Sequence, residues 1–197
     1  MVTQTRSAGA GADIASADVA WANPGNITAS DAARAVSGTL NSTQTRFLQA
    51  TSFGFVIPTD ATITAITVSY ERSQTGAGAN ILLRAGRLLK AGVAVGDLQD
   101  DPGPWATSDE VVVLSGITNP LWNTTWTPAQ INASDFGFKM QVAEDSGNDG
   151  TARVDHISIT VTFTEAAAAT LPFYGQSVPP VYPPNLGFTR FSTTVVP

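Results

Sequence analysis

Few residues in this chain of 197 residues could do acid–base or nucleophilic chemistry. His156 is the single histidine, and there is no cysteine. Asp155 directly precedes His156, but neighbouring side chains in a strand point to opposite faces, so the two do not belong to one Ser-His-Asp triad. We therefore interpret His156 as a surface or sheet-edge side chain. One histidine without any cysteine also excludes a zinc site built from these two residue types.

Glycoside hydrolysis would require two carboxylates that flank one glycosidic bond. The acidic candidates are Asp97, Asp100, Asp101, Asp109 and Glu110. Most of them fall in expected turns, where an aspartate usually accepts hydrogen bonds from its own backbone. We predict no catalytic residue, no bound cofactor and no enzyme activity.

Two further motifs could bind a ligand. Residues 144–150 (EDSGNDG) supply oxygen ligands of the kind that Ca²⁺ prefers, without the spacing of an EF-hand. The same composition is typical of hairpin turns, so we favour a turn and predict no metal. Trp105, Trp122 and Trp126 could form an aromatic platform for sugars. Because tryptophan is usually buried, we favour the interpretation that they cover an open end of the core.

The elements that carry these residues are mainly strands. In residues 157–164 (ISITVTFT) and 136–143 (FGFKMQVA), large apolar residues alternate with polar or small ones, which predicts half-buried antiparallel strands. Further strands are expected at 47–57, 66–71, 81–84, 88–95 and 110–114, with Ala85-Gly86 as a break. Ile63 is out of phase with Ile66, which indicates a bulge or a turn between them. Short helical turns are expected at 127–131 and 30–36.

Seven or eight short strands with polar turns predict an all-β fold, an antiparallel β-sandwich of jelly-roll type with extended N- and C-terminal arms. We place the sandwich domain at residues 21–165. Residues 1–20 have little to bury and are expected to form a flexible arm, with an arm that a neighbouring subunit orders as the alternative. Residues 166–197 hold six of the 12 prolines and are expected to be an extended arm. Its aromatic residues are the predicted partner-binding residues: Phe173, Tyr174, Tyr182, Phe188 and Phe191.

Charge and hydropathy exclude several classes of partner. The 10 Lys and Arg residues are scattered against 16 Asp and Glu residues, so the net charge of −6 argues against nucleic-acid binding. No apolar run reaches the length of a membrane-spanning segment. Charged residues make up 13% of the chain, against about 25% in an average soluble domain. A weakly charged, threonine-rich surface suits a protein in contact with other protein.

An ordered set of segments resembles the β-sandwich domains in structural proteins of tailed bacteriophages. These segments are residues 21–27 (WANPGNI), 53–58 (FGFVIP), 61–68 (ATITAITV), 121–132 (LWNTTWTPAQIN), 136–138 (FGF) and 154–161 (VDHISITV). Domains of this kind occur in capsid decoration (cement) proteins, fibres and tail-tip modules. The resemblance covers about residues 21–164.

The resemblance implies a non-enzymatic virion protein that is made in the host cytoplasm. Its leading form is a decoration protein that bridges and stabilises capsid subunits. Its partners would be the major capsid protein and neighbouring copies of itself, in a trimer or a dimer. The alternative is a carbohydrate- or receptor-binding module of a tail fibre or spike.

Overall fold

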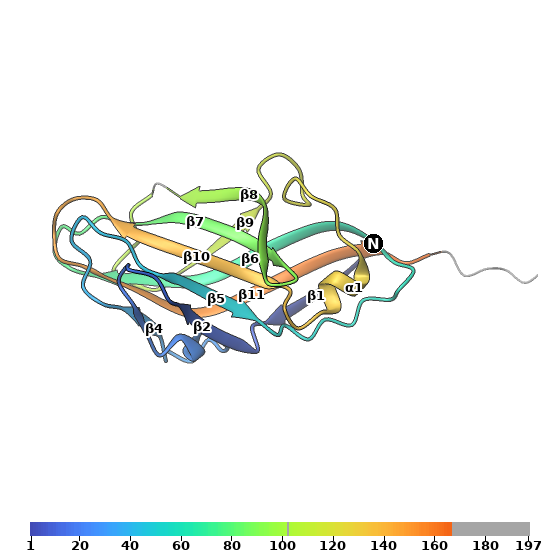
Figure 1. Cartoon of the computed structure of the whole chain (residues 1–197), viewed down its shortest axis with the longest axis horizontal. Helices are drawn as coiled ribbons and strands as arrows, with labels where there is room; N and C mark the ends of the chain where they lie inside the picture. Colours follow the sequence, from blue (N-terminus) through green and yellow to red (C-terminus); the bar gives the residue numbers. More distant parts are fainter. Residues whose placement is uncertain (102, 167–197) are drawn as a thin grey trace, which may run out of the picture. The chain divides into compact units, whose positions relative to one another are not determined.

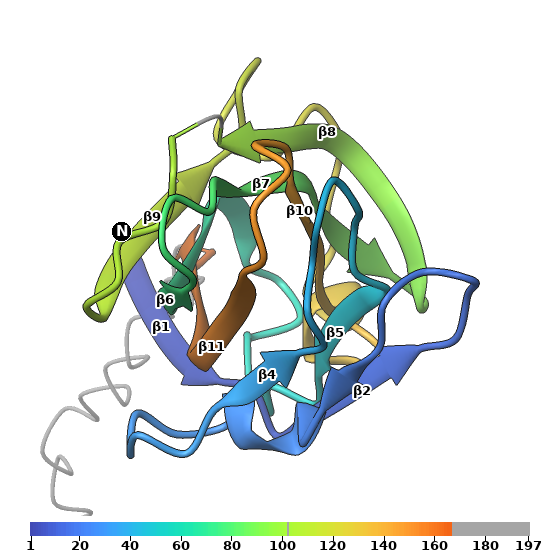
Figure 2. The ribbon, with the colours of Figure 1, turned by 90° about the vertical axis from the view of Figure 1, so that its left-hand side faces the viewer.

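Two antiparallel sheets pack face to face in this computed structural model, which describes residues 1–101 and 103–166 (Figure 1). Sheet A has the order β3 (Trp21–Ala22), β4 (Ala35–Ser37), β11 (Thr151–Thr164), β6 (Thr62–Thr75) and β9 (Glu110–Ser115), and β1 (Val2–Ser7) also pairs with β11. Sheet B has the order β2 (Ala10–Ile14), β5 (Phe47–Thr51), β10 (Gly137–Glu144), β7 (Ile81–Lys90) and β8 (Val93–Asp101). Figure 2 shows both sheets from one end of the sandwich. The predicted all-β sandwich is confirmed.

The core lies between the sheets, where the predicted alternation places it. From Ile157 to Thr164, every second residue of β11 is buried, and the threonines and the serine between them are half-exposed. On the facing sheet, Phe138, Met140 and Val142 of β10 are fully buried. The strict period of two in both segments thus determines which face of each strand packs inward.

Bulges correct the register at three places in the long strands. The pairing of β11 with β6 skips Thr64, which confirms the irregularity expected between Ile63 and Ile66. It also skips Asp155, so His156 faces Glu71 of β6. In sheet B the pairing of β10 with β7 skips Arg84. Each extra residue shifts the side-chain alternation by one position, which keeps apolar residues directed inward on both sides of the bulge.

The predicted break at Ala85-Gly86 is wrong, because β7 runs through it to Lys90. A Cβ on Gly86 would lie 3.0 Å from Cζ of Phe138, so the glycine permits close packing of a phenylalanine ring rather than a turn. The turn between β7 and β8 is formed by Ala91 and Gly92, with φ values of 51° and 73°. Two successive residues with positive φ are typical of a tight hairpin turn. The strand expected at 47–57 ends at Thr51.

One of the two expected helical turns is present. Helix α1 (Pro128–Asn132) begins at the N-cap Thr127, whose hydroxyl accepts from the backbone N–H of Gln130, while the Gln130 side chain bonds back to Thr127. No helix forms over 30–36, which was predicted wrongly. There Asp155 accepts a hydrogen bond from the backbone N–H of Ala32 at 3.0 Å, and Ala32 has a φ of 65°. This tertiary contact overrides the local preference for a helix. A short 3-10 helix, η1 (Pro24–Ile27), also occurs.

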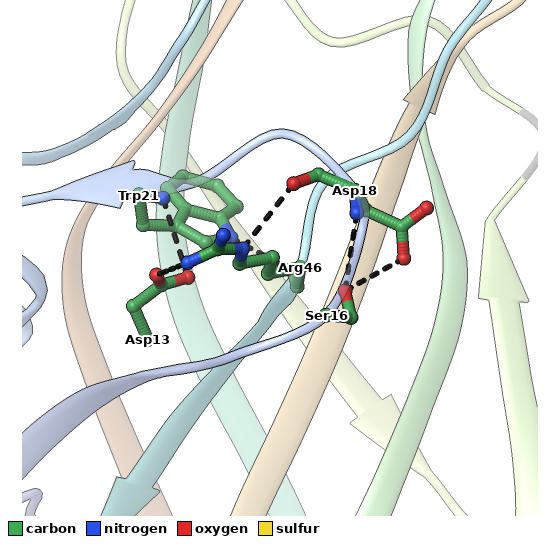
Figure 3. Close-up of polar contacts among 5 residues, drawn as sticks. All are labelled: Asp13, Ser16, Asp18, Trp21 and Arg46. Atoms are coloured by element: carbon green, nitrogen blue, oxygen red, sulfur yellow. Dashed lines mark hydrogen bonds and ion pairs between the residues drawn. The ribbon is translucent and has the colours of Figure 1, made fainter.

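The prediction that residues 1–20 form a flexible arm is wrong. Strand β1 pairs with β11 along its whole length, and β2 pairs with β5. The connection after β2 is held by polar contacts that Figure 3 shows: the Arg46 guanidinium lies 3.0 Å from the Asp13 carboxylate and donates to the Asp18 carbonyl at 3.2 Å. The Trp21 indole N–H donates to the Arg46 carbonyl at 2.9 Å. Residues 1–20 therefore contribute one strand to each sheet. Of the predicted C-terminal arm, residues 167–197 lie outside the described residues.

Candidate functional site

The outer face of sheet A carries a regular array of hydroxyl groups. Directly paired residues in antiparallel strands share a face, so the register aligns Thr5, Thr160, Thr67 and Ser115 in one row across four strands. The nine residues of this hydroxyl face are Thr3, Thr5, Ser7, Ser158, Thr160, Thr162, Thr67, Ser69 and Ser115. One pair is joined directly, because the Thr5 and Thr160 hydroxyl oxygens lie 2.8 Å apart.

The hydroxyl face suits contact with another polar protein surface. Its rows hold no charged side chain, so a partner would not have to remove water from an ion. Hydroxyl groups can both donate and accept hydrogen bonds, so they adapt to either kind of group on a partner. The arrangement provides many weak polar contacts.

An apolar strip borders the hydroxyl face along β9, the last strand of sheet A. Val111 and Val113 are 65% and 63% exposed, and Ile117 just beyond the strand is 67% exposed. Both valines lie on the outer side of the sheet, because they pair with Glu71 and Ser69 of β6. We name Val111 and Val113 the β9 edge. An exposed apolar edge strand is a typical site for binding another protein.

His156 lies at one end of the hydroxyl face and contacts a residue that the sequence did not indicate. Its Nε2 atom lies 2.9 Å from the hydroxyl oxygen of Ser7, a distance at which a base can activate a nucleophile. Asp155 does not complete a triad, because it occupies the bulge, is 3% exposed and accepts from Ala32. The pair joins β11 to β1 on the surface of the sheet. The surface position expected for His156 is confirmed, but a sheet-edge position is not, because His156 pairs with Glu71 on one side and with Thr28 on the other.

The carboxylates considered for glycoside hydrolysis are mostly used within the fold. Asp101 and Glu110 both bind Arg72, each at 2.8 Å, and the Arg72 side chain is 6% exposed. Asp109 pairs with Arg34, whose hydrogen bond holds the pKa of the Asp109 carboxyl below its usual range. Two further candidates differ in their contacts: Asp97 accepts from the backbone N–H of Thr118 at 3.1 Å, whereas Asp100 is exposed.

Arg72 is also enclosed by aromatic rings. Its guanidinium carbon lies 5.2 Å from the ring centre of Trp105 and 5.7 Å from that of Tyr70. Its Nη1 donates to the Tyr70 hydroxyl at 3.2 Å. Burial raises the pKa of Tyr70 to about 12, so this hydroxyl stays protonated at neutral pH. The cluster joins β6 to the ends of β8 and β9 and has the character of a structural ion pair.

The tryptophans are buried, as we favoured. Trp105 and Trp122 are 1% and 0% exposed, and Trp126 is 8% exposed. The Trp122 indole donates to the Ile66 carbonyl at 2.9 Å, and Trp126 packs edge-on against Phe136 at 5.3 Å between ring centres. These rings complete the core and offer no open platform for a sugar.

The 144–150 loop is organised by the Glu144 carboxylate, which accepts from the backbone N–H groups of Ser42, Asn80, Ser146 and Gly147. Burial raises the pKa of Glu144, but the hydrogen bonds from the Ser146 hydroxyl and from these amides outweigh it and hold the pKa at about 2. The carboxylate thus joins three loops. The loop itself connects β10 of sheet B to β11 of sheet A, so it is not the hairpin turn that the composition indicated.

Beside this loop lies a polar pocket of about 340 Å³. It is lined by Ser42, Thr43, Gln44, Arg84, Ala143, Glu144 and Asp145. No group of three or more His, Cys, Asp or Glu side chains in the described part of the chain is placed to hold a metal ion. Within the same residues, no helix is long and apolar enough to cross a membrane.

Sequence reasoning missed two features of this surface. Ser7 was missed because residues 1–20 were expected to be a free arm. The exposed valines of β9 could have been predicted from the sequence. Three consecutive valines at 111–113 must put apolar side chains on both faces of a strand. The predicted partner-binding residues, Phe173, Tyr174, Tyr182, Phe188 and Phe191, lie outside the described residues.

Comparisons with known proteins give only distant likeness. No protein-family model matches the chain, and no curated protein matches its sequence. One solved chain, from work described as "CBM4 structure and function", is 11% identical with a TM-score of 0.39, over 80% of this chain and 94% of that chain. A chain from the structure of infectious bursal disease virus, Gx strain, is 15% identical with a TM-score of 0.23. That match covers 70% of this chain and 38% of the viral chain.

Proposed function

We propose that this chain is a non-enzymatic structural protein of a bacteriophage particle, which decorates the capsid and cements its subunits. The hydroxyl face is the observation that carries the proposal: it is four strands wide, uncharged, and bordered by exposed valines. Such a surface binds protein through area and hydrogen bonds rather than through a few ions. The partners would be the major capsid protein and neighbouring copies of this chain, and the site of action the virion.

Cementing follows from repetition of a modest contact. A decoration protein that touches two capsid subunits adds its binding free energy to the cost of separating them. Summed over a lattice, weak contacts of this kind raise the stability of the whole particle. Residues 166–197 add five aromatic side chains in the sequence, and we propose that these also contact neighbouring subunits.

The alternative, a carbohydrate- or receptor-binding module of a fibre or spike, has less support among the described residues. The large exposed hydrophobic residues there include no aromatic side chain, and the three tryptophans considered for a sugar platform are buried. The polar pocket beside Glu144 offers hydrogen-bonding groups without an aromatic ring among its lining residues. Sugar-binding sites generally combine both.

Copy number in purified particles tests the proposal. Particles from a host that carries the gene should contain this chain at a number close to that of the major capsid protein, measured by quantitative mass spectrometry. Absence from the particles, or a copy number that is a small fraction of the capsid protein's, would contradict cementing, and a small number would favour the fibre alternative.

A second test uses the hydroxyl face directly. The variant Thr67→Lys should keep its melting temperature within a few degrees but bind poorly to particles stripped of this chain. Gln49→Lys places the same charge on the outer side of sheet B and should bind normally. Equal binding by both variants would show that the hydroxyl face is not the contact surface.

A further inference from the structure

The free edges of the two sheets differ in how they are protected. Unprotected edge strands pair with other chains, so proteins usually cover them, distort them or charge them. Strand β2 packs against η1, where a Cβ on Gly11 would lie 1.9 Å from the Pro24 carbonyl oxygen. Strand β8 is distorted by two register shifts and carries three aspartates. On β1, the Gln4 amide bonds to the backbone of Val56.

Strand β9 has none of these protections among the described residues. Its pairing with β6 runs without a register shift over all six residues, and it contains no proline or lysine. Its one charged residue, Glu110, is held by Arg72. Figure 2 shows β9 at the margin of sheet A, and its two outward valines are more than 60% exposed.

The direction of the β9 backbone groups follows from the strand beside it. The N–H of Ile66 donates to the Pro120 carbonyl, and the N–H of Gln74 donates to the Ala106 carbonyl, so even-numbered residues of β6 direct their backbone groups toward the β9 side. Their partners Val112 and Leu114 are thus hydrogen-bonded to β6. The N–H and C=O groups of Val111 and Val113 therefore point to the free edge.

We propose that the β9 edge pairs with the β9 edge of a second copy of this chain, antiparallel and around a two-fold axis. The Ser115 carbonyl already accepts from the Gln99 side chain at 2.7 Å, which leaves Val111 and Val113 as the residues with free backbone groups. The register that uses all of these groups places Val111 opposite Val113 of the other copy. It puts Val112 on the two-fold axis, opposite itself.

This register is compatible with self-association because the facing side chains carry no charge. A two-fold contact brings identical residues together, so any charge at its centre would face its own copy. Here the four outward side chains are valines, which would pack together on the outer side of a sheet that continues from one copy into the next. The contact is short, so the dimer should have a dissociation constant in the micromolar range. Its affinity is then lower than that of an interface of standard size.

The two-fold register predicts a specific cross-link. A non-hydrogen-bonded antiparallel pair places its Cα atoms about 4.5 Å apart, within the range of a disulfide. The chain has no cysteine, so Val112→Cys introduces a single thiol, which should form a disulfide-linked dimer under mild oxidation. Val56→Cys, at a residue that is 71% exposed, is the matched control and should stay monomeric on a non-reducing gel.

Sedimentation velocity of the full chain measures the association itself. We expect a reversible dimer whose dissociation constant rises at least tenfold in Val113→Lys and stays unchanged in Val56→Lys. A chain that stays monomeric up to millimolar concentration, a dimer that Val113→Lys does not weaken, or equal cross-linking of Val112→Cys and Val56→Cys would each overturn the proposal. These outcomes are separate from particle binding, which tests the proposed function.

Discussion

Ser7 and His156 are 149 residues apart in the sequence, yet the hydroxyl of Ser7 lies 2.9 Å from Nε2 of His156. The contact exists because β1 pairs along β11 and places Ser7 opposite Ser158, next to the bulge at Asp155. A serine and a histidine at this distance resemble the first two members of a catalytic triad. Their surroundings differ, because the pair lies on an exposed sheet surface, and the polar pocket is lined by other residues.

We predict that Ser7 is not an activated nucleophile. Nucleophilic catalysis needs a third group that orients the histidine and N–H donors that stabilise an oxyanion, and the nearest aspartate in sequence, Asp155, is bonded to Ala32 instead. A fluorophosphonate probe should leave Ser7 unlabelled, as judged by intact mass. His156→Ala should bind particles like the wild type. Stoichiometric labelling that His156→Ala abolishes would instead establish a reactive dyad.

The Arg72 cluster should contribute strongly to stability. Arg72→Ala removes a buried cation that binds two carboxylates and leaves space beside Trp105 and Tyr70. We expect a loss of about 3 kcal/mol in the free energy of unfolding, at the lower end for a broken buried ion pair because Asp101 and Glu110 can be hydrated. Urea denaturation measures the loss.

The control for Arg72→Ala is Arg84→Ala. Arg84 lies 3.6 Å from Asp145, and its side chain is 52% exposed, so its removal should cost less than about 1 kcal/mol. Equal losses for the two variants would mean that burial of the Arg72 cluster adds nothing to its stabilising effect.

The sequence predicted the inner strands of the fold well and its margins poorly. Ile157, Ile159 and Val161 are buried between two sheets, so their alternation is strict and visible. Strand β1 (VTQTRS) has no apolar face, because it lies at a sheet edge and is held by backbone pairing with β11. A strand of this kind carries no hydrophobic period. Gly86 caused the opposite error, a turn predicted inside a strand. A glycine is common in turns, but here it makes room for the ring of Phe138.

The candidate surface was predictable only in part. Residues 110–114 were expected to form a strand, and β9 covers Glu110–Ser115. That Val111 and Val113 are exposed depends on the position of β9 at the end of sheet A, which results from pairing with a strand about 40 residues earlier in the chain. No local pattern encodes such a position.

The stability of the chain should fall in acid through Glu144. Its pKa is about 2 in the folded chain and 4.5 in the reference state, so between these values the unfolded chain binds more protons at this group. The stabilisation is therefore complete above about pH 4.5 and is lost as the pH falls toward 2. Glu144→Gln should be less stable than the wild type by about 2 kcal/mol at pH 7, because an amide cannot replace a carboxylate that accepts several N–H groups.

Urea denaturation at a series of pH values measures this effect. The difference between Glu144→Gln and the wild type should narrow as the pH falls from 4.5 to about 2. Ser146→Ala removes one hydrogen bond to the carboxylate and should show a smaller difference with the same dependence on pH. A difference that stays constant over this range would show that the Glu144 charge is not the source of the stabilisation.

The last prediction concerns the N-terminal residues, which the sequence suggested to be a flexible arm. Gly11 lies in β2, and a Cβ at this position would lie 1.9 Å from the Pro24 carbonyl oxygen and 2.9 Å from Cγ1 of Ile27. Gly11→Ala must therefore push β2 away from η1, and we expect a loss of about 2 kcal/mol in the free energy of unfolding, typical of overpacking.

Gly25→Ala is the control, because a Cβ there meets nothing within 4 Å. It should change stability by no more than about 0.5 kcal/mol. Thermal denaturation of both variants distinguishes the two descriptions: a strand packed on η1 requires a lower melting temperature for Gly11→Ala alone, whereas a free arm would leave both variants at the wild-type value.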